Sequence, residues 1–308
     1  MRALLIANPK ATSTSRRVRD LLVRTFSAGL DLELEETGYR GHATALAEQA
    51  AVDGYDVVVA CGGDGTVNET VNGLLAGGPS PDLPALAVLP CGSANVFARS
   101  LGLPNDPIRA TSRVLDALRN ERHRTVGLGQ ADDRYFTFSA GIGWDAEVVH
   151  AVEQARQSGF RAKPQLYVLT ALRQFFAVSD RRRPALTMYR PGHPAVRGMF
   201  MAIVSNTSPW TYLGKRPVVP SPRADFNAGL DVFGTRRLDA LTTIGLLAQM
   251  LVPMNDGVRG RSVVDVHDAS EITMAASRPI AFQLDGEYLG TREQITFRSI
   301  PKAIRIVI

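Results

Sequence analysis

Residues 61–69, CGGDGTVNE, combine residue types that bind phosphate and metal ions. Glycines let the backbone approach an anion closely, and backbone N–H groups at a helix start favour negative charge. Asp64 can hold a metal ion that bridges phosphate oxygens, and Thr66 adds a hydroxyl donor. Asn68 and Glu69 are close enough to reach back towards a bound nucleotide. A tight turn with an acidic helix cap is the alternative, so the segment does not decide alone.

Two further segments follow short apolar runs and open helices in the same way. They are 89–104 (LPCGSANVFARSLGLP) and 7–17 (ANPKATSTSRR), and their polar candidates are Gly92, Ser93, Asn95 and Asn8. In open α/β sheets, ligands bind outside the carboxyl ends of the strands. We therefore expect the three turns to line one crevice, although each taken singly is also compatible with an ordinary helix cap.

A fourth segment, FQLDGEYLG at 282–290, carries two carboxylates. Asp-Gly between alternating apolar residues predicts a two-residue β-hairpin, and the local pattern favours that interpretation. The functional alternative is that Asp285 and Glu287 point towards a crevice. A carboxylate there could accept a hydroxyl proton during phosphoryl transfer.

The elements expected up to about residue 125 alternate between strand and helix. Apolar runs at 3–7, 56–60 and 85–89 predict buried strands, 30–36 an edge strand, and 13–28, 42–54, 68–75, 93–102 and 106–120 helices. Such alternation is typical of a parallel α/β sheet.

After residue 126, beyond a charged connector at 120–126, short strand candidates dominate and predict an antiparallel β domain. Two helical stretches, 145–178 and 238–251, interrupt them. Within the first, residues 163–183 place apolar side chains at near-helical spacing beside arginines, a pattern that suits an anionic bilayer. Packing on the helix's own domain is the stronger interpretation, and it is stronger still for 238–251.

The bulk composition narrows the class of protein. The net charge of +5 and 45% hydrophobic content describe a globular chain with a mild preference for anionic partners. Two cysteines form no disulfide framework, the five histidines show no metal spacing, and we expect a reducing, intracellular setting. The longest apolar run, 241–254, is too short for a membrane span, and the start shows no signal layout.

Taken together, the segments resemble the diacylglycerol kinase catalytic-domain family of lipid kinases. The signatures are Asn8-Pro9, GGDGTVNE (62–69), PCGSANVFAR (90–99), AGIGWDAEVV (140–149), GLDVFGTRRLDAL (229–241) and DGE (285–287). The resemblance implies a three-layer α/β nucleotide-binding domain like that of NAD kinase and phosphofructokinase, followed by an antiparallel β-sandwich domain. We expect an ATP-binding domain over 1–126, to which 300–308 returns, and a lipid-substrate domain over 127–299.

The resemblance also implies roles for single residues. The residues that would lie against the ATP phosphates are Gly62, Gly63, Asp64, Gly65 and Thr66. Asn68 and Glu69 would support the nucleotide site. The cleft would be lined by Asn8, Gly92, Ser93 and Asn95. Asp285 matches the family's general base, with Glu287 beside it. Asp64 would serve the nucleotide's Mg²⁺, and Asp225 and Asp231 lie near the family's structural Mg²⁺ site. The sequence ADFNAGLD (224–231) departs from the family's usual pattern at that Mg²⁺ site. In the second motif, PCGSANVFAR, Val96 stands where many members have a carboxylate.

The implied activity is that of an ATP- and Mg²⁺-dependent lipid kinase acting on diacylglycerol or a related lipid. Its partner would be a membrane lipid, met by a cytoplasmic protein that attaches transiently to the inner face of the membrane. A homodimer is compatible with the resemblance, and no nucleic-acid partner is expected. Two alternatives stay open: an NAD kinase, which shares the Gly-Gly-Asp-Gly-Thr turn, and a non-catalytic nucleotide- or lipid-binding regulator.

Overall fold

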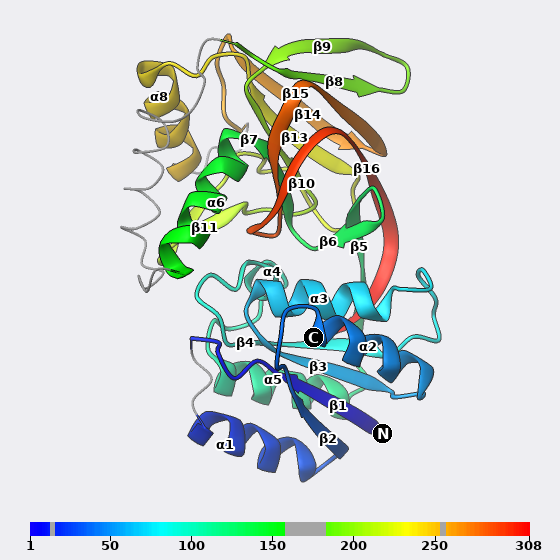
Figure 1. The fold of residues 1–308 in the computed structure, drawn as a ribbon. Coiled ribbons are helices and arrows are strands. Elements are labelled where there is room, and N and C mark those ends of the chain that lie inside the picture. The colour runs from blue at the N-terminus through cyan, green and yellow to red at the C-terminus, as the bar shows by residue number, and fades with distance from the viewer. Residues whose placement is uncertain (13–15, 158–182, 253–256) are drawn as a thin grey trace. The chain divides into compact units, whose positions relative to one another are not determined.

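The computed structural model describes residues 1–12, 16–157, 183–252 and 257–308 (Figure 1). Within these residues the chain forms two compact units. The first consists of Met1–Leu128 together with Pro301–Ile308, and the second of Gly129–Ile300.

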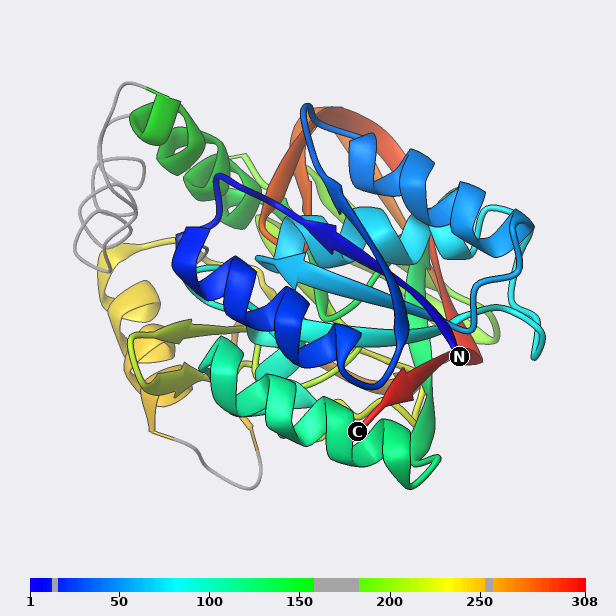
Figure 2. The ribbon, with the colours of Figure 1, turned by 90° about the horizontal axis from the view of Figure 1, so that it is seen from below.

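The first unit is built on a parallel sheet. Its strands are β1 (Arg2–Ala7), β2 (Asp31–Glu36), β3 (Val57–Gly62), β4 (Ala85–Pro90) and the end of β16 (Glu287–Val307), in the order β16-β4-β3-β1-β2. The helices are α1 (Arg16–Ser27), α2 (His42–Val52), α3 (Asp64–Leu74), α4 (Val96–Ser100) and α5 (Pro107–Arg119). α2 and α3 cover one face of the sheet, and α1 and α5 lie side by side on the other (Figures 1 and 2). The predicted three-layer α/β fold is confirmed.

Local sequence explains this arrangement. Every residue of β3 and β4 is buried, as expected for central strands covered on both faces, whereas β2 alternates at the edge. The predicted start of α5 is also confirmed, because the Asp106 side chain accepts a hydrogen bond from the Arg109 N–H and Pro107 occupies the first turn. Both cysteines are buried in the core of this unit, and their sulfur atoms lie 2.9 Å apart.

The second unit is built mainly from antiparallel strands. They are β6 (Arg134–Phe136), β7 (Ser139–Gly143), β8 (Leu186–Arg190), β9 (His193–Met199), β10 (Met201–Ser205), β11 (Thr211–Leu213), β12 (Arg216–Val218), β13 (Leu230–Thr235), β14 (Val263–Ala269), β15 (Glu271–Leu284) and the first part of β16. The main path runs β14-β13-β10-β7-β15-β16, and β8 joins β15 to β9. The α/β-plus-β fold class is thus confirmed.

Several predicted boundaries in this part of the chain are wrong. The sequence offers two short strand candidates here, EITMAA (271–276) and PIAFQLD (279–285), where the structure has the single strand β15. β15 bends between the two candidates: its first half pairs with β8 and its last residues pair with β7, with a register shift between Ala275 and Ile280. β16 likewise joins two strand candidates of the sequence, EQITFR (293–298) and AIRIVI (303–308), and β5 (His123–Ala131) begins inside the expected connector.

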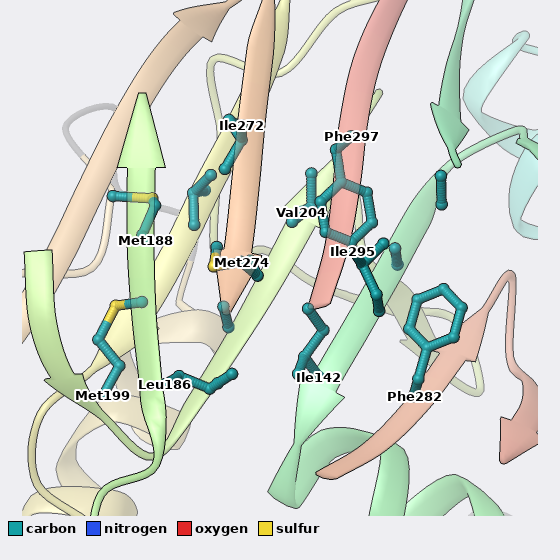
Figure 3. Packing of buried hydrophobic residues seen from close by; sticks show 14 of the residues in the cluster. Ile142, Leu186, Met188, Met199, Val204, Ile272, Met274, Phe282, Ile295 and Phe297 are labelled. Carbon is teal, nitrogen blue, oxygen red and sulfur yellow. The ribbon is translucent and has the colours of Figure 1, made fainter. Parts of the chain in front are cut away.

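The core of the second unit is apolar and draws on most of its strands. Figure 3 shows Ile142 of β7, Met188 of β8 and Val204 of β10 among the labelled side chains that fill it. Phe297 of β16 is fully buried and lies within 6.4 Å, ring centre to ring centre, of Phe282 of β15. This packing fixes both sides of the β15–β16 hairpin.

Among the described residues of this unit, two helices accompany the strands, α6 (Trp144–Gln157) and α8 (Ala240–Leu251). Most of the predicted apolar stretch 163–183 lies outside the described residues. α8 was expected to pack on its own domain, which is correct for one face only. Leu246 and Met250 are buried, but Leu241 is 85% exposed and Ile244 is 62% exposed. Among the described helices, none has the length and apolar character needed to cross a membrane.

Candidate functional site

In the first unit, the glycine-rich segment lies at the junction of β3 and α3. β3 ends at Gly62 and α3 begins at Asp64, so the prediction of a loop followed by a helix from Asn68 is wrong. The first helical bond runs from the Val67 N–H to the Gly63 carbonyl, 3.1 Å away. The N–H groups of Asp64, Gly65 and Thr66 therefore precede the helical ladder, and Gly63 has no side chain to cap them. Such a helix start is suited to an anion.

A second turn, between β4 and α4, packs directly against the first. A Cβ added to Gly92 would lie 2.4 Å from the Cα of Gly63, closer than any side chain tolerates. Asn95 shapes this turn from a left-handed backbone conformation, with φ of 49°. Its side chain accepts from the Gly92 N–H at 2.8 Å and donates to the Gly92 carbonyl at 2.9 Å. Gly92 and Asn95 thus build the turn, as glycine and asparagine suit such backbone.

Asp64 links the two turns. Its Oδ1 accepts a hydrogen bond of 3.1 Å from the Phe97 N–H, in the first turn of α4. Asp64 is also the acidic residue in the first turn of α3, where negative charge is favourable. The carboxylate is therefore held at the point where the turns after β3 and β4 meet.

The turn after β1 joins the same cluster. The Asn8 amide donates to the Thr66 hydroxyl at 3.1 Å, and the Asn8 side-chain oxygen accepts from the Lys10 N–H at 2.9 Å. The hydroxyls of Thr12 and Ser93 lie 3.1 Å apart. The structure thus brings together the three turns that were predicted from the ends of apolar runs.

Glu69 and Asn68 lie elsewhere than the sequence suggested. Both are within α3, one turn beyond its start. The two carboxylate oxygens of Glu69 accept from the backbone N–H groups of Gly41 and Ala43, at 2.9 and 3.2 Å. Glu69 therefore holds the start of α2, where a negative charge stabilises the helix, while Asn68 is buried. The turns after β1, β3 and β4 are called the three-turn cluster below. Asn68 and Glu69 support this cluster indirectly, through the position of α3.

In the second unit, Asp285 and Gly286 form the turn between β15 and β16. Both have positive φ, 47° and 78°, and Leu284 pairs with Glu287 across the turn. These are the features of a two-residue hairpin of the type that Asp-Gly favours, so the local prediction was correct.

The Asp285 side chain is 5% exposed and is surrounded by donors. Its Oδ2 accepts from the N–H and hydroxyl of Thr137, at 2.7 and 2.8 Å. Its Oδ1 accepts from the N–H groups of Phe138 and Ser139, at 3.0 and 3.1 Å. An ionised carboxylate has about four acceptor positions, and these four donors match them. Asp285 thus anchors the segment that leads into β7; its role as proton acceptor stays a prediction.

Two neighbours extend this network. Glu287 forms an ion pair of 2.6 Å with Arg134 of β6. Gln283 accepts from the Gly286 N–H at 2.9 Å and donates to Oδ2 of Asp145 at 2.8 Å. A chain of hydrogen bonds therefore runs from the hairpin turn to Asp145.

Asp145 is a candidate that sequence reasoning did not select, although the motif AGIGWDAEVV contains it. It is buried at the start of α6, and burial raises its pKa to about 6, against the opposing hydrogen bond from Gln283. Gly141 makes room for it, because a Cβ there would lie 1.6 Å from Asp145 Oδ2. The available signal was its position as an acidic residue at the start of the predicted helical stretch 145–178.

Beside Asp145 lies an apolar cavity of about 110 Å³. Its walls come from α6, β10, β13, α8 and the loop before β11. The lining side chains include Trp144, Val148, Ile203, Trp210, Phe233, Leu246 and Met250. Asp145 is the carboxylate among the lining residues, so the cavity combines an apolar body with one titratable group.

We expect Asp145→Asn to stabilise the protein in a pH-dependent way. The folded-state pKa of Asp145 is raised, so the ionised form costs stability as pH rises from about 4 through 6. Asparagine keeps the acceptor for Gln283 and removes the charge. The gain should be about 3 kcal/mol at pH 7.5 and about half that at pH 5. Urea unfolding of the two proteins at both pH values measures it.

The exposed Asp133 gives the matched control for that experiment. Asp133→Asn should leave stability nearly unchanged at both pH values, because a hydrated carboxylate pays no burial cost. A loss of stability in Asp145→Asn at pH 7.5 would show that the ionised form is bound by the fold, contrary to the raised pKa.

The two aspartates proposed for a structural Mg²⁺ have other partners. Asp231 is buried and accepts from His267 Nδ1 at 2.7 Å and from the Asp268 N–H at 3.1 Å. Asp225 is exposed and accepts from the backbone and side chain of Asn227. Over the described residues, no group of three or more His, Cys, Asp or Glu side chains could hold a metal ion. A metal there stays a prediction that rests on the resemblance.

Part of the chain matches a known protein family. Residues 2–131 match the diacylglycerol kinase catalytic domain. A diacylglycerol kinase of Bacillus subtilis (strain 168) is 35% identical over 153 residues, 49% of this chain and 48% of that protein. One from Staphylococcus aureus (strain NCTC 8325 / PS 47) is 34% identical over 178 residues, 54% of each chain. The chain thus matches about half the length of these curated relatives.

Solved structures extend the likeness to the whole fold. The crystal structure of a diacylglycerol kinase from Bacillus anthracis str. Sterne has a TM-score of 0.69 at 20% identity, covering 99% of this chain and 96% of that one. An NAD kinase from Archaeoglobus fulgidus in complex with ATP scores 0.54 at 11% identity, covering 100% and 94%. At such identities the likeness shows the fold alone. Over residues 2–131, the comparisons therefore support the predicted resemblance to the diacylglycerol kinase catalytic-domain family.

Proposed function

We propose that the protein is an ATP-dependent lipid kinase, which transfers the γ-phosphate of ATP to the hydroxyl of diacylglycerol or a related lipid. The observation that carries the proposal is the open start of α3, held against the Gly92 turn by backbone contact at Gly63. The match of residues 2–131 to the diacylglycerol kinase catalytic domain supports it. We also propose that the protein is cytoplasmic and meets its lipid at the inner face of the membrane. The proposal includes no nucleic-acid partner, and it is compatible with a homodimer.

ATP binding follows from the chemistry of the three-turn cluster. The N–H groups that begin α3 would donate hydrogen bonds to phosphate oxygens. Gly65 leaves space there, since a Cβ on it would meet nothing within 4 Å. The hydroxyls of Thr12, Thr66 and Ser93 add further donors around this start. A phosphate bound here would therefore be held mainly by backbone and hydroxyl groups.

Mg²⁺ is the proposed companion of the nucleotide. Asp64 supplies a carboxylate to the three-turn cluster. A carboxylate oxygen is the kind of hard ligand that Mg²⁺ prefers. A Mg²⁺ ion usually takes one or two protein carboxylates and completes its shell with phosphates and water, so Asp64 fits that role. When bound, the metal neutralises charge that develops on the phosphate oxygens.

Acceptance of a lipid is supported by the second unit. The apolar cavity beside Asp145 suits hydrocarbon, and the Asp145–Gln283 hydrogen bond gives it a polar end. In the transfer, the lipid hydroxyl oxygen bonds to the γ-phosphorus, the bond to ADP breaks, and the hydroxyl proton leaves to a base. Asp285 is proposed as that base, which requires one of its four donors to give way to the lipid hydroxyl.

The proposal is tested with the purified chain, radiolabelled ATP and Mg²⁺. The acceptors are vesicles that contain diacylglycerol, a sphingoid base or neither, and in a separate reaction NAD⁺. We expect label on diacylglycerol or a related lipid and none after Asp64→Asn, which shows that the activity belongs to this site. Labelled NADP⁺ would instead identify an NAD kinase. No product with any acceptor, together with retained ATP binding, would favour the non-catalytic regulator.

A further inference from the structure

Helix α8 of the second unit is apolar on both of its faces. Its twelve residues, ALTTIGLLAQML, include no charged side chain. The inner face buries Thr243, Leu246 and Met250. A surface helix of a globular protein normally turns polar residues outwards, so the outer face of α8 needs an explanation.

The outer face is a continuous apolar stripe. Leu241, Ile244, Gly245, Ala248 and Val252 are all exposed and follow the three- and four-residue spacing of one helix side. Of the large exposed apolar side chains in the described part of the chain, Leu241, Ile244, Leu247 and Val252 fall within this single segment. Scattered apolar residues on a surface are ordinary, whereas a cluster of this kind marks an interaction site.

Positive charge flanks the stripe at both ends of α8. Exposed Arg236 and Arg237 precede the helix, and exposed Arg259 and Arg261 follow it. The Gln249 side chain bonds to the backbone N–H and carbonyl of Arg259, at 2.9 and 3.2 Å, which ties that arginine segment to the last turns of α8. Among the described residues, an opposing charge at the start of α8 is Asp239, which caps the helix and pairs with Arg237 at 3.3 Å. An apolar stripe between basic flanks is complementary to an anionic lipid surface.

The helix also forms a wall of the apolar cavity. Leu246, Leu247 and Met250 line the cavity, and Leu247 is at the same time 37% exposed. One side of α8 therefore faces the proposed hydrocarbon site while the other side faces outwards. A helix in this position would place that site next to the surface on which the outer stripe docks.

We propose that α8, with its arginine flanks, docks the second unit on the surface of an anionic lipid bilayer. The stripe Leu241–Val252 enters the interface, and the arginines bind the lipid headgroup phosphates. The biological purpose of this docking rests on the proposed function. Docking would bring the cavity to the membrane that holds the acceptor lipid.

The test is vesicle co-sedimentation of the full chain. The probes are phosphatidylcholine vesicles with and without phosphatidylglycerol. We expect binding to the anionic vesicles and a loss of at least about tenfold in the combined variant Leu241→Gln with Ile244→Gln. The matched control is Leu21→Gln with Val52→Gln, two exposed apolar positions of the first unit, which should bind like the unaltered chain. Equal binding of all three proteins, or no binding by the unaltered chain, would overturn the proposal.

A second measurement separates docking from catalysis. Leu241 and Ile244 do not line the cavity, so phosphorylation of detergent-dispersed short-chain diacylglycerol should be unchanged in the variant. If no lipid is phosphorylated but vesicle binding is lost in the variant, docking stands and the proposed function fails. Sedimentation of the lipid-free proteins measures their oligomeric state. If the unaltered chain is a dimer and the variant is a monomer, the stripe is a contact between two copies, and bilayer docking is overturned.

Discussion

Asp285→Asn is expected to abolish phosphate transfer and to destabilise the protein by on the order of 4 kcal/mol. Both oxygens of the buried Asp285 carboxylate accept from two donors each, on Thr137, Phe138 and Ser139. Asparagine keeps one oxygen and replaces the other with an NH₂ group, which must then face two donors. Guanidinium unfolding and turnover with labelled ATP, measured on the same preparation, report both effects.

The combination of the two measurements distinguishes an anchor from a proton acceptor. A residue that acts only as a base leaves stability unchanged when it becomes asparagine, since the change in size is negligible. Glu287→Gln is the control in the same turn: it breaks one partly exposed ion pair with Arg134 and should cost about 1 kcal/mol or less. Full activity of Asp285→Asn would contradict the assignment of Asp285 to the reaction.

What the sequence predicted well depends on local chemistry. The strand–helix alternation of the first unit follows from apolar runs that are buried on both faces of a parallel sheet. The Asp106-Pro107 start of α5 and the Asp285-Gly286 turn are each specified by two adjacent residues, whose backbone preferences need no distant partner. The adjacency of the three turns also follows, because parallel strands end at one edge.

What the sequence did not reveal depends on distant partners. Glu69 is a helix cap for α2, 26 residues or more from the N–H groups that it binds, so its motif position suggested a different task. Burial raises the pKa of Asp145, and its hydrogen-bond partner Gln283 lies 138 residues away in the sequence. The bend in β15 exists because the strand changes partner from β8 to β7, which Pro279 alone cannot indicate.

Gly92→Ala is expected to reduce ATP affinity at least about a hundredfold and to destabilise the first unit by on the order of 3 kcal/mol. The added Cβ would meet backbone: the Gly63 Cα at 2.4 Å and the Gly63 nitrogen at 3.3 Å, besides the Asn95 side-chain oxygen at 2.9 Å. Because backbone cannot rotate away, the turns after β3 and β4 must separate. Calorimetry with ATP and thermal unfolding measure the two effects.

Gly65→Ala shows whether the cost comes from this contact or from the loss of any glycine in the motif. Gly65 lies in the first turn of α3, and a Cβ there would meet nothing within 4 Å. Alanine should therefore leave thermal stability unchanged or raise it, by up to about 1 kcal/mol of helix propensity. If both variants lost stability equally, close approach at Gly63–Gly92 would not be the reason for the glycines. If Gly65→Ala stays stable but binds ATP weakly, the open space beside Gly65 is the space that the phosphates occupy.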